Sequence, residues 1–537
     1  MNKCKTVLSG SIAFFVLLSA CTNEKIDSIA ERQNGVTLKK HYTEEDVKEF
    51  LERSGNEARK LLTDYALAGW TGVTYVTPDT QATTKLLWDR AVAQEKTAAQ
   101  EVRKFDDVEM NPSLKRQVNI LKLSAMETIP LDTKNADKLS GFSNELIATA
   151  SNTLNCGDNS NCRNTTTINS LMAKSDDYNE LLKLWSEAGE QYKPMNEIYK
   201  TRVNLANEGA RDVGYSDVGA LWRSYYDMPE QEFETELDKV WEQIQPLYNA
   251  MQCHIKSKLS DKYGNDKINL DSPIDAHLLG SVEANNWSNL QSLVMPNQPT
   301  LIRSYDINEA LVEQNYDAIK IVKTAESLYT SMGFKPLPES FWERSQFTKP
   351  VYPDGGYVNT NCNAFPLDLG GDDQRFHMCI EPNEKDFNKA HSIMEFSYYA
   401  MAYNKHQPYY FQNLSGDPAS FLAMNDAMEL SLTPEYLHQI GLIDDVPDAS
   451  HDIAFLMQTA FEKIMDIPYY LAVEKWRWQV YSGEISPNDY NEKWWDHREQ
   501  YQGVSAPTER SINHFDPGAS RYVVHDRSLK DRIMAGI

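Results

Sequence analysis

The sequence is short of basic residues, has few cysteines and lacks a long hydrophobic run. Its 537 residues contain 53 lysines and arginines against 78 aspartates and glutamates, a formal net charge of −25. Binding to nucleic acid requires clustered cations that neutralise phosphates, so this composition argues against a nucleic-acid partner. The apolar stretch over 7–18 is too short for a typical membrane-spanning helix. The sequence has no Gly-x-Ser-x-Gly elbow, a common signal of a serine hydrolase. It also has no Cys-x-x-Cys pair, a common signal of a zinc site.

The first twenty residues have the pattern of a lipoprotein signal peptide. Lys3 and Lys5 precede the apolar stretch, and Leu18-Ser19-Ala20-Cys21 fits a bacterial lipobox. We therefore predict a signal peptide over 1–20, lipid on Cys21 and a polar tether over 21–40. The expected location is the bacterial cell envelope, with the lipid anchor as the membrane contact. An ordinary secretory signal with a chance cysteine is the alternative.

Helical periodicity prevails in the rest of the chain. Thr43 precedes an acidic first turn and is followed by Val47, Phe50 and Leu51 at helical spacings, a pattern typical of a capped amphipathic helix. The clearest non-helical segment is 351–364, where Asp354-Gly355-Gly356 separates two short apolar pairs and predicts a hairpin. The sequence therefore predicts a mainly α fold.

The segment 390–437 carries the strongest family signal. It reads AHSIMEFSYYAMAYNKHQPYYFQNLSGDPASFLAMNDAMELSLTPEYL. It resembles the catalytic segment of the angiotensin-converting enzyme family of peptidyl-dipeptidases, in which His-His-Glu-x-x-His and Tyr-Tyr precede Gly-Ala-Asn-Pro-Gly-Phe-His-Glu-Ala and then Thr-Pro-Glu-x-Leu. Segments 273–280, 287–289, 451–457, 476–478, 494–503 and 515–519 continue the resemblance in family order.

The resemblance implies a gluzincin fold for residues 41–537. In this family one domain forms a large helical ellipsoid of two lobes around a deep cleft. A small antiparallel β element lies near the active site. We expect the same architecture here.

The residues that hold zinc in the family are replaced in this sequence. Family members use two histidines and a later glutamate as ligands, with a glutamate beside the first histidine as general base. An ungapped alignment places Ser392 at the first histidine, Ile393 at the base, Phe396 at the second histidine and Leu422 at the third ligand. We call these four residues the zinc-site positions. Since none of them is a usual zinc donor, we expect no zinc and no catalytic residue.

A rebuilt metal site is the alternative at this helix. His391 and Glu395 are four residues apart, and His377 and His406 are near in the sequence. Glu395 takes the place of a spacer in the family motif, however, and histidines on amphipathic helices are more often packing residues than ligands.

The end of the chain departs from the family as well. Beyond Phe515-Asp516-Pro517-Gly518-Ala519 the family has a lysine, a histidine and two tyrosines that hold the substrate carboxylate and the transition-state oxyanion, followed by further helices. The ungapped reading places Ser520, Tyr522, Leu529 and Arg532 at these four positions, and the chain stops at Ile537. Loss of groups that stabilise developing charge would itself impair hydrolysis.

The resemblance implies two disulfides and a peptide-binding edge. The disulfides are Cys156–Cys162 and Cys362–Cys379. Cys253 is left over, and we expect a buried free thiol there. In the family a strand near 351–364 lines the cleft and pairs with bound peptide, and Asn363-Ala364 stands in the place of its His-Ala pair.

The resemblance further implies a chloride held by Arg223, Trp494 and Arg498. Two guanidinium groups and an indole N–H can all donate to one buried anion. An ion pair between each arginine and a carboxylate is an equally good interpretation, because the chain is rich in acidic residues.

Two functions remain open at the level of sequence. The first is an envelope lipoprotein that is proteolytically inactive and binds peptides or serves as a scaffold for an envelope protein. The second is a divergent peptidase or hydrolase that uses a rebuilt metal site or needs no metal.

Overall fold

The protein was analysed as a computed structural model that describes residues 41–124, 129–152, 163–285, 287–295, 305–370, 373–402, 408–411, 418–448 and 452–535. The predicted signal peptide, lipidation site and tether, together with Cys156, Cys162 and His406, lie outside these ranges. Within them, no helix is long and apolar enough to cross a membrane.

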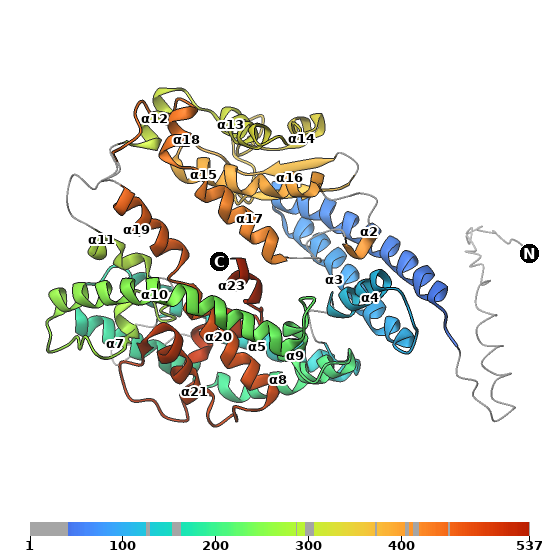
Figure 1. Ribbon diagram of the computed structural model, residues 1–537, viewed down its shortest axis with the longest axis horizontal. Coiled ribbons are helices and arrows are strands. Elements are labelled where there is room, and N and C mark those ends of the chain that lie inside the picture. The colour runs from blue at the N-terminus through green and yellow to red at the C-terminus, as the bar shows by residue number, and fades with distance from the viewer. Residues whose placement is uncertain are drawn as a thin grey trace, which may run out of the picture.

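Helices make up most of the described chain, which confirms the mainly α prediction (Figure 1). The first group comprises α2 (Glu44–Thr74), α3 (Pro78–Glu101) and α4 (Pro112–Ser124). The lower lobe of Figure 1 comprises α5 (Thr133–Asn152), α6 (Thr165–Met172), α7 (Tyr178–Tyr192), α8 (Met195–Asp212), α9 (Val218–Arg223), α10 (Glu230–Tyr263), α11 (Gln291–Val294), α19 (Asp452–Lys463), α20 (Ile467–Ser482), α21 (Tyr490–His497), α22 (Arg521–Val524) and α23 (Lys530–Ala535). The upper lobe comprises α12 (Ile307–Glu313), α13 (Ala318–Ser331), α14 (Glu339–Arg344), α15 (Glu384–Ile393), α16 (Glu395–Ala402), α17 (Pro418–Leu430) and α18 (Pro434–Gln439).

Side-chain caps fix the starts of the long N-terminal helices. The Thr43 hydroxyl accepts from the Asp46 amide, and the Asp46 carboxylate accepts from the Thr43 amide, which is the predicted cap of α2. Thr77 and Thr80 form a second reciprocal cap at α3, with Pro78 in the first turn. Such caps satisfy backbone donors that have no partner inside the helix.

The sheets are small. Strand β1 (Ile274–Asp275) pairs in parallel with β4 (Val504–Ser505), and β2 (Phe365–Asp368) pairs antiparallel with β3 (Gln374–His377), with Phe365 opposite His377. The β2–β3 pair precedes α15 directly, which agrees with the predicted antiparallel element near the zinc-site positions.

The predicted hairpin is present at 351–358 in a short form. Val351 and Tyr357 form a single bridge, and the turn is closed by the Tyr352 amide donating to Gly356 O at 2.6 Å. On the other side of the bridge the Val358 amide donates to Pro350 O at 2.9 Å, and the side chains of Val351 and Tyr357 are 58% and 67% exposed. Without a core face to bury, the two apolar pairs do not extend into strands.

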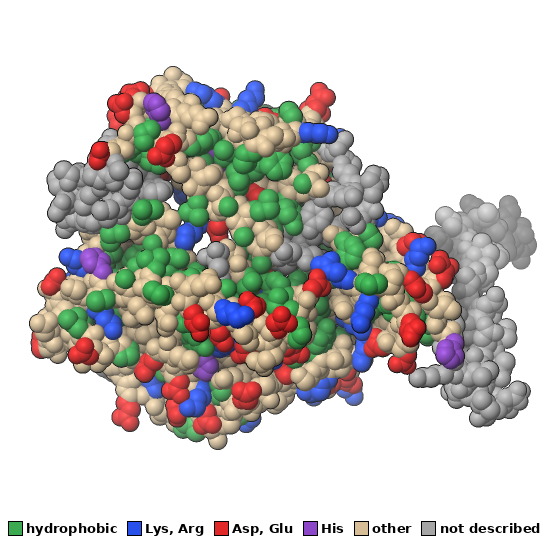
Figure 2. Space-filling view, in the orientation of Figure 1, with side chains coloured by type: hydrophobic (Ala, Val, Ile, Leu, Met, Phe, Trp, Pro, Cys, Tyr) green, Lys and Arg blue, Asp and Glu red, His purple; other side chains and the backbone are tan. Residues whose placement is uncertain are grey.

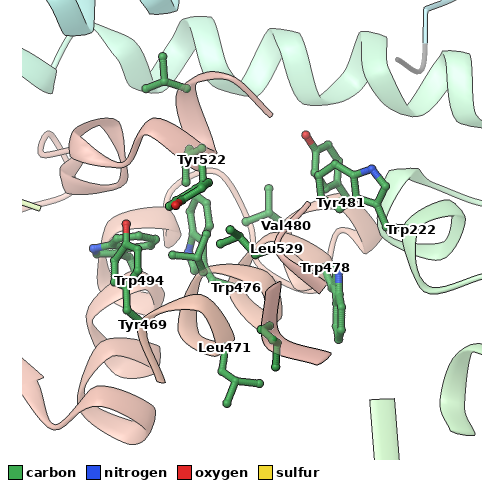
Figure 3. Close-up of a cluster of buried hydrophobic side chains, with 14 of the residues drawn as sticks. Trp222, Tyr469, Leu471, Trp476, Trp478, Val480, Tyr481, Trp494, Tyr522 and Leu529 are labelled. Carbon is green, nitrogen blue, oxygen red and sulfur yellow. The ribbon is translucent and has the colours of Figure 1, made fainter. Parts of the chain in front are cut away.

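Two separate hydrophobic cores underlie the two lobes. The larger core joins α2–α4 to the lower lobe, and the smaller core lies entirely within the upper lobe, between Ile307 and Ile443. Figure 3 shows the centre of the larger core around α20, where Trp476 lies edge-on to Trp494, with ring centroids 5.3 Å apart, and stacks on Tyr199 at 5.9 Å. Aromatic pairs in such geometry add to the stabilisation from burial alone.

The two lobes meet through the C-terminal helix and one cluster of ion pairs. Helix α23 packs against α17 of the upper lobe and α20 of the lower lobe, and it lies between the lobes in Figure 1. Lys463 on α19 pairs with Asp426 and Glu429 on α17, both at 2.8 Å. Figure 2 shows the surface hollowed between the lobes, with acidic side chains spread over the lower lobe.

Candidate functional site

The zinc-site positions lie on three helices of the upper lobe. Ser392 and Ile393 end α15, Phe396 is in α16, and Leu422 is in α17. Helix α17 packs against both α15 and α16. The elements that would bring three ligands and a general base together are therefore present and in contact.

The immediate surroundings of these positions are aromatic. The Phe396 ring meets the Phe421 ring edge to face, with centroids 5.9 Å apart and planes at 89°. Tyr399 approaches Phe421 from another side, at 5.6 Å. Ser392 is buried, and its hydroxyl donates to Lys389 O at 3.3 Å. The Phe396 ring thus packs on Phe421, and the Ile, Phe and Leu side chains at three of the four positions offer no lone pairs to a cation.

Helix α15 is interrupted within the region where the family has its metal-binding motif. It ends at Ile393, and α16 begins at Glu395. The Tyr329 hydroxyl donates to His391 O at 2.8 Å, and the Tyr329 ring stacks on Tyr398 at 4.3 Å with planes at 7°. A side chain that inserts into the backbone ladder of a helix is a recognised cause of such a break.

His391 and His377, two of the three histidines considered for a rebuilt metal site, are engaged elsewhere. His391 Nδ1 donates to Phe387 O at 2.7 Å, and its Nε2 lies 3.1 Å from the Tyr436 hydroxyl. Burial lowers the pKa of His391 to about 4, so its imidazole is neutral. His377 Nε2 donates to Asn361 O at 2.6 Å. Within the described ranges, no group of three or more His, Cys, Asp or Glu is placed to hold a metal ion.

Glu395 is the unusual titratable group of this region. Its side chain is 0% exposed, and neither carboxyl oxygen has a hydrogen-bond partner in the part of the chain that the structure describes. Burial alone raises the pKa of Glu395 to about 8. Sequence reasoning considered this residue only as a metal ligand and missed its burial, because spacing does not reveal which face of an interrupted helix points inward.

The predicted chloride trio is divided in the structure. Trp494 and Arg498 lie together, with the Arg498 guanidinium 5.5 Å from the Trp494 ring centroid. Arg498 Nε donates to Gln502 Oε1 at 2.6 Å, and its Nη2 donates to Ala284 O at 3.2 Å. Arg223 is elsewhere and pairs with Glu230 at 3.1 Å, which is the carboxylate pairing that the sequence left open.

The cavity beside Arg498 is small and already contains negative charge. Its volume is about 10 Å³, close to the space of one water molecule. Glu283 and Asp516 both line it, whereas Arg223 does not. Asp516 accepts from Arg510 Nε and Nη2, both at 2.9 Å, and Glu283 accepts from the Tyr469 hydroxyl. Chloride binding stays a prediction, and these two carboxylates weigh against it.

The predicted peptide-binding residues lie at the start of β2. Asn363 is exposed and Ala364 half-buried, and they follow the disulfide Cys362–Cys379, which joins this segment to the residues before α15. Strand β2 pairs on one side with β3, and no second strand pairs with it among the described residues. Pro366 in β2 lacks a backbone N–H, as suits an edge strand.

Cys253 differs from its prediction. It is a free thiol in α10, as expected, but it is exposed where we expected burial. It falls on the solvent side of the helix, roughly opposite the buried Ile255, which is two residues further along.

Three of the four C-terminal positions are tied into the lower lobe. The Ser520 hydroxyl accepts from Tyr469 at 2.7 Å, and Tyr522 O accepts from Arg477 at 2.9 Å. Leu529 is buried, and its amide donates to Glu474. Arg532 is exposed.

Two buried ion pairs hold this segment and were missed from the sequence. Arg477 and Glu474, one turn apart on α20, are both 0% exposed, with Nη2 and Oε1 3.0 Å apart. Arg202 pairs with Asp526, which has φ of +52°, and Tyr481 donates to the same carboxylate. Glu474 and Arg477, three residues apart in the apolar run of α20, were a signal of buried pairing, whereas Arg202 and Asp526 lie too far apart in sequence for their pair to be inferred.

The helical fold of two lobes, with a short β pair before α15, is consistent with the peptidase family that the sequence resembles. The sequence model described as angiotensin-converting enzyme, peptidase family M2, matches residues 41–535. The chain belongs to this family.

Curated relatives agree with this assignment. The angiotensin-converting enzyme of Sus scrofa is 32% identical over 490 residues, which cover 89% of this chain and 36% of the relative. The enzyme of Mus musculus is 32% identical over 484 residues, 88% of this chain and 36% of the relative. That of Theromyzon tessulatum is 31% identical over 494 residues, 90% of this chain and 78% of the relative. This chain spans about a third of the length of the mammalian relatives that it matches.

Proposed function

We propose that this chain is a non-catalytic member of the angiotensin-converting enzyme family, anchored by lipid at Cys21 in the bacterial cell envelope, that binds peptides or supports an envelope protein. Zinc hydrolysis needs three ligands and a general base within reach of one bound water. Ser392, Ile393, Phe396 and Leu422 supply none of these groups.

The observation that carries the proposal is the aromatic packing at the zinc-site positions. Phe396 and Phe421 fill the space between α16 and α17 with ring contacts. A divalent cation placed among such groups would lose its hydration without gaining ligands, which is strongly unfavourable. Contacts between side chains therefore hold α16 and α17 in position.

Peptide binding is supported by the free edge of β2. Extended peptides add to exposed strand edges through backbone hydrogen bonds, a mode that does not depend on catalytic residues. The disulfide Cys362–Cys379 fixes the residues that lead into this edge, which reduces the conformational entropy lost on binding.

Hydrolysis is tested with the purified chain and a library of peptides, with and without added zinc. We expect no release of dipeptides above the buffer rate in either condition. The same assay is run on a comparison variant that places the family's ligands and general base at the zinc-site positions. This variant carries Ser392→His, Ile393→Glu, Phe396→His and Leu422→Glu together. Turnover by the unmodified chain at enzyme-like rates would refute the proposal.

Peptide binding is tested with fluorescence anisotropy of labelled peptides from the same library. Ala364→Pro removes one backbone donor beside β2, and we expect binding to weaken about tenfold. Ala364→Ser keeps the donor and serves as the control. Equal affinity of both variants would remove this edge from the proposal and leave the scaffold role.

A metal-free hydrolase is the second candidate, and Glu395 is the observation that favours it. A carboxyl group with a pKa of about 8 is protonated at neutral pH and can act as a general acid. Its complete burial argues against contact with substrate. Loss of any measured hydrolysis in Glu395→Gln, with folding intact, would favour this candidate.

A further inference from the structure

A cavity of about 630 Å³ lies in the lower lobe, remote in sequence from the zinc-site positions. Its walls come from α5, α8 and α9 and from residues 524–531, which follow the last family motif. A volume between about 300 and 1,000 Å³ is typical of pockets for small molecules. The cavity is independent of the peptide-binding edge of β2.

The floor of this cavity is apolar. Leu139, Ala206, Leu221, Trp222 and Val524 line it and are buried. Such a surface favours the apolar body of a ligand, because burying it removes that body from water.

The charged lining is positive on balance although the whole chain is strongly negative. Arg202, Arg527 and Lys530 contribute three cations, and Asp526 and Asp531 contribute two carboxylates. Two of the cations are neutralised, since Arg202 pairs with Asp526 at 2.5 Å and Lys530 pairs with Asp531 at 2.9 Å. Arg527 is exposed and has no ion pair among the described residues.

The turn that presents Arg527 is held in a strained conformation. Asp526 has φ of +52°, a region that residues other than glycine rarely adopt. Arg202 and the Tyr481 hydroxyl both contact its carboxylate at 2.5 Å. His525, next to it, also lines the cavity, and burial together with Arg527 and Arg202 lowers its pKa, as a positive local potential would.

From these features we infer that this cavity binds a small amphiphilic carboxylate, with the acid at Arg527 and the apolar body against Trp222 and Leu221. A charge-assisted bond from an arginine to a carboxylate is among the stronger hydrogen bonds in proteins. An aliphatic acid and a short apolar peptide with a free C-terminus share this chemistry.

Isothermal titration calorimetry with decanoate, decanol and N-acetyl-Leu-Phe at constant ionic strength tests the inference. We expect saturable binding of at least one of the two carboxylates, at least about tenfold tighter than decanol. The tighter of the two acids identifies the source of the ligand. No saturable binding by either acid, or equal binding of decanol, would overturn the inference.

Two variants locate the ligand. Arg527→Gln removes the unpaired cation from an exposed position and should weaken carboxylate binding about tenfold without changing decanol binding. Lys138→Gln removes an equally exposed cation from α5, outside the cavity lining, and should change affinity less than about twofold. Equal effects of the two variants would show a non-specific charge effect and refute the assignment.

Discussion

Buried charged side chains in the lower lobe have partners, whereas Glu395 in the upper lobe has none among the described residues. Arg477 has Glu474, Arg202 has Asp526, and Arg510 has Asp516, all within 3.0 Å. In the upper lobe the zinc-site positions are Ser, Ile, Phe and Leu. The lower lobe keeps its buried charges in ion pairs, and the upper lobe keeps its helices without a polar site. A fold can thus be maintained by one region while the site in another changes.

The largest expected effect concerns the buried pair on α20. Arg477→Met leaves the Glu474 carboxylate buried without its cation, and we expect a loss of about 3–5 kcal/mol in the free energy of unfolding. Equilibrium unfolding in urea, followed by circular dichroism, measures it. A loss below about 1 kcal/mol would show that the lower lobe does not depend on its pairs and would remove the contrast between the lobes.

The second largest effect on stability is expected from the disulfide of the upper lobe. Replacing Cys362 and Cys379 by serine releases a loop with a sequence separation of 17, and we expect a loss of about 3 kcal/mol from the added entropy of the unfolded chain. Cys253→Ser, which removes an exposed free thiol, is the matched control and should change nothing. Unfolding in urea of both variants, side by side, decides whether the bond stabilises the upper lobe.

The unpartnered carboxyl group of Glu395 predicts that the stability of the folded chain depends on pH. The pKa of Glu395 is raised from 4.5 to about 8 in the folded state, so the folded chain keeps a proton that the unfolded chain has lost between these values. The stability contributed by this group is complete below pH 4.5 and is lost as the pH rises towards 8, with a slope of up to about 1.4 kcal/mol per pH unit.

Urea unfolding of Glu395→Gln between pH 5 and pH 8 checks this slope. The amide cannot ionise, so the variant should lose the decline that this group causes and should be more stable than the unmodified chain at pH 8. An unchanged pH profile would mean that Glu395 is ionised and partnered, and the contrast between the lobes would then be wrong.

The smallest effect is expected at Arg223. Its pair with Glu230 is at the surface, where the glutamate side chain is 40% exposed, so Arg223→Ala should cost less than about 1 kcal/mol. In Arg223→Ala, as in the unmodified chain, we expect added chloride to leave the free energy of unfolding unchanged. A cost comparable to that of Arg477→Met would indicate that Arg223 has a structural role beyond its surface ion pair.

The sequence was sufficient for some features and insufficient for others, for physical reasons. The cap at Thr43 is local and followed from residue types, and the disulfide Cys362–Cys379 and the family followed from ordered motifs. The turn of the hairpin at 351–358 followed from Asp354-Gly355-Gly356, but its short length did not, because the exposure of Val351 and Tyr357 depends on tertiary packing. The separation of Arg223 from Arg498 could not be foreseen, because each partner is chosen by the fold and many carboxylates were available.

The zinc content of the purified chain tests the central claim most directly. Elemental analysis after dialysis against zinc should find well below one zinc per unmodified chain, and a stoichiometric amount in the variant with Ser392→His, Ile393→Glu, Phe396→His and Leu422→Glu, since the helices that carry these positions are already in contact. One tightly held zinc per unmodified chain would contradict the account.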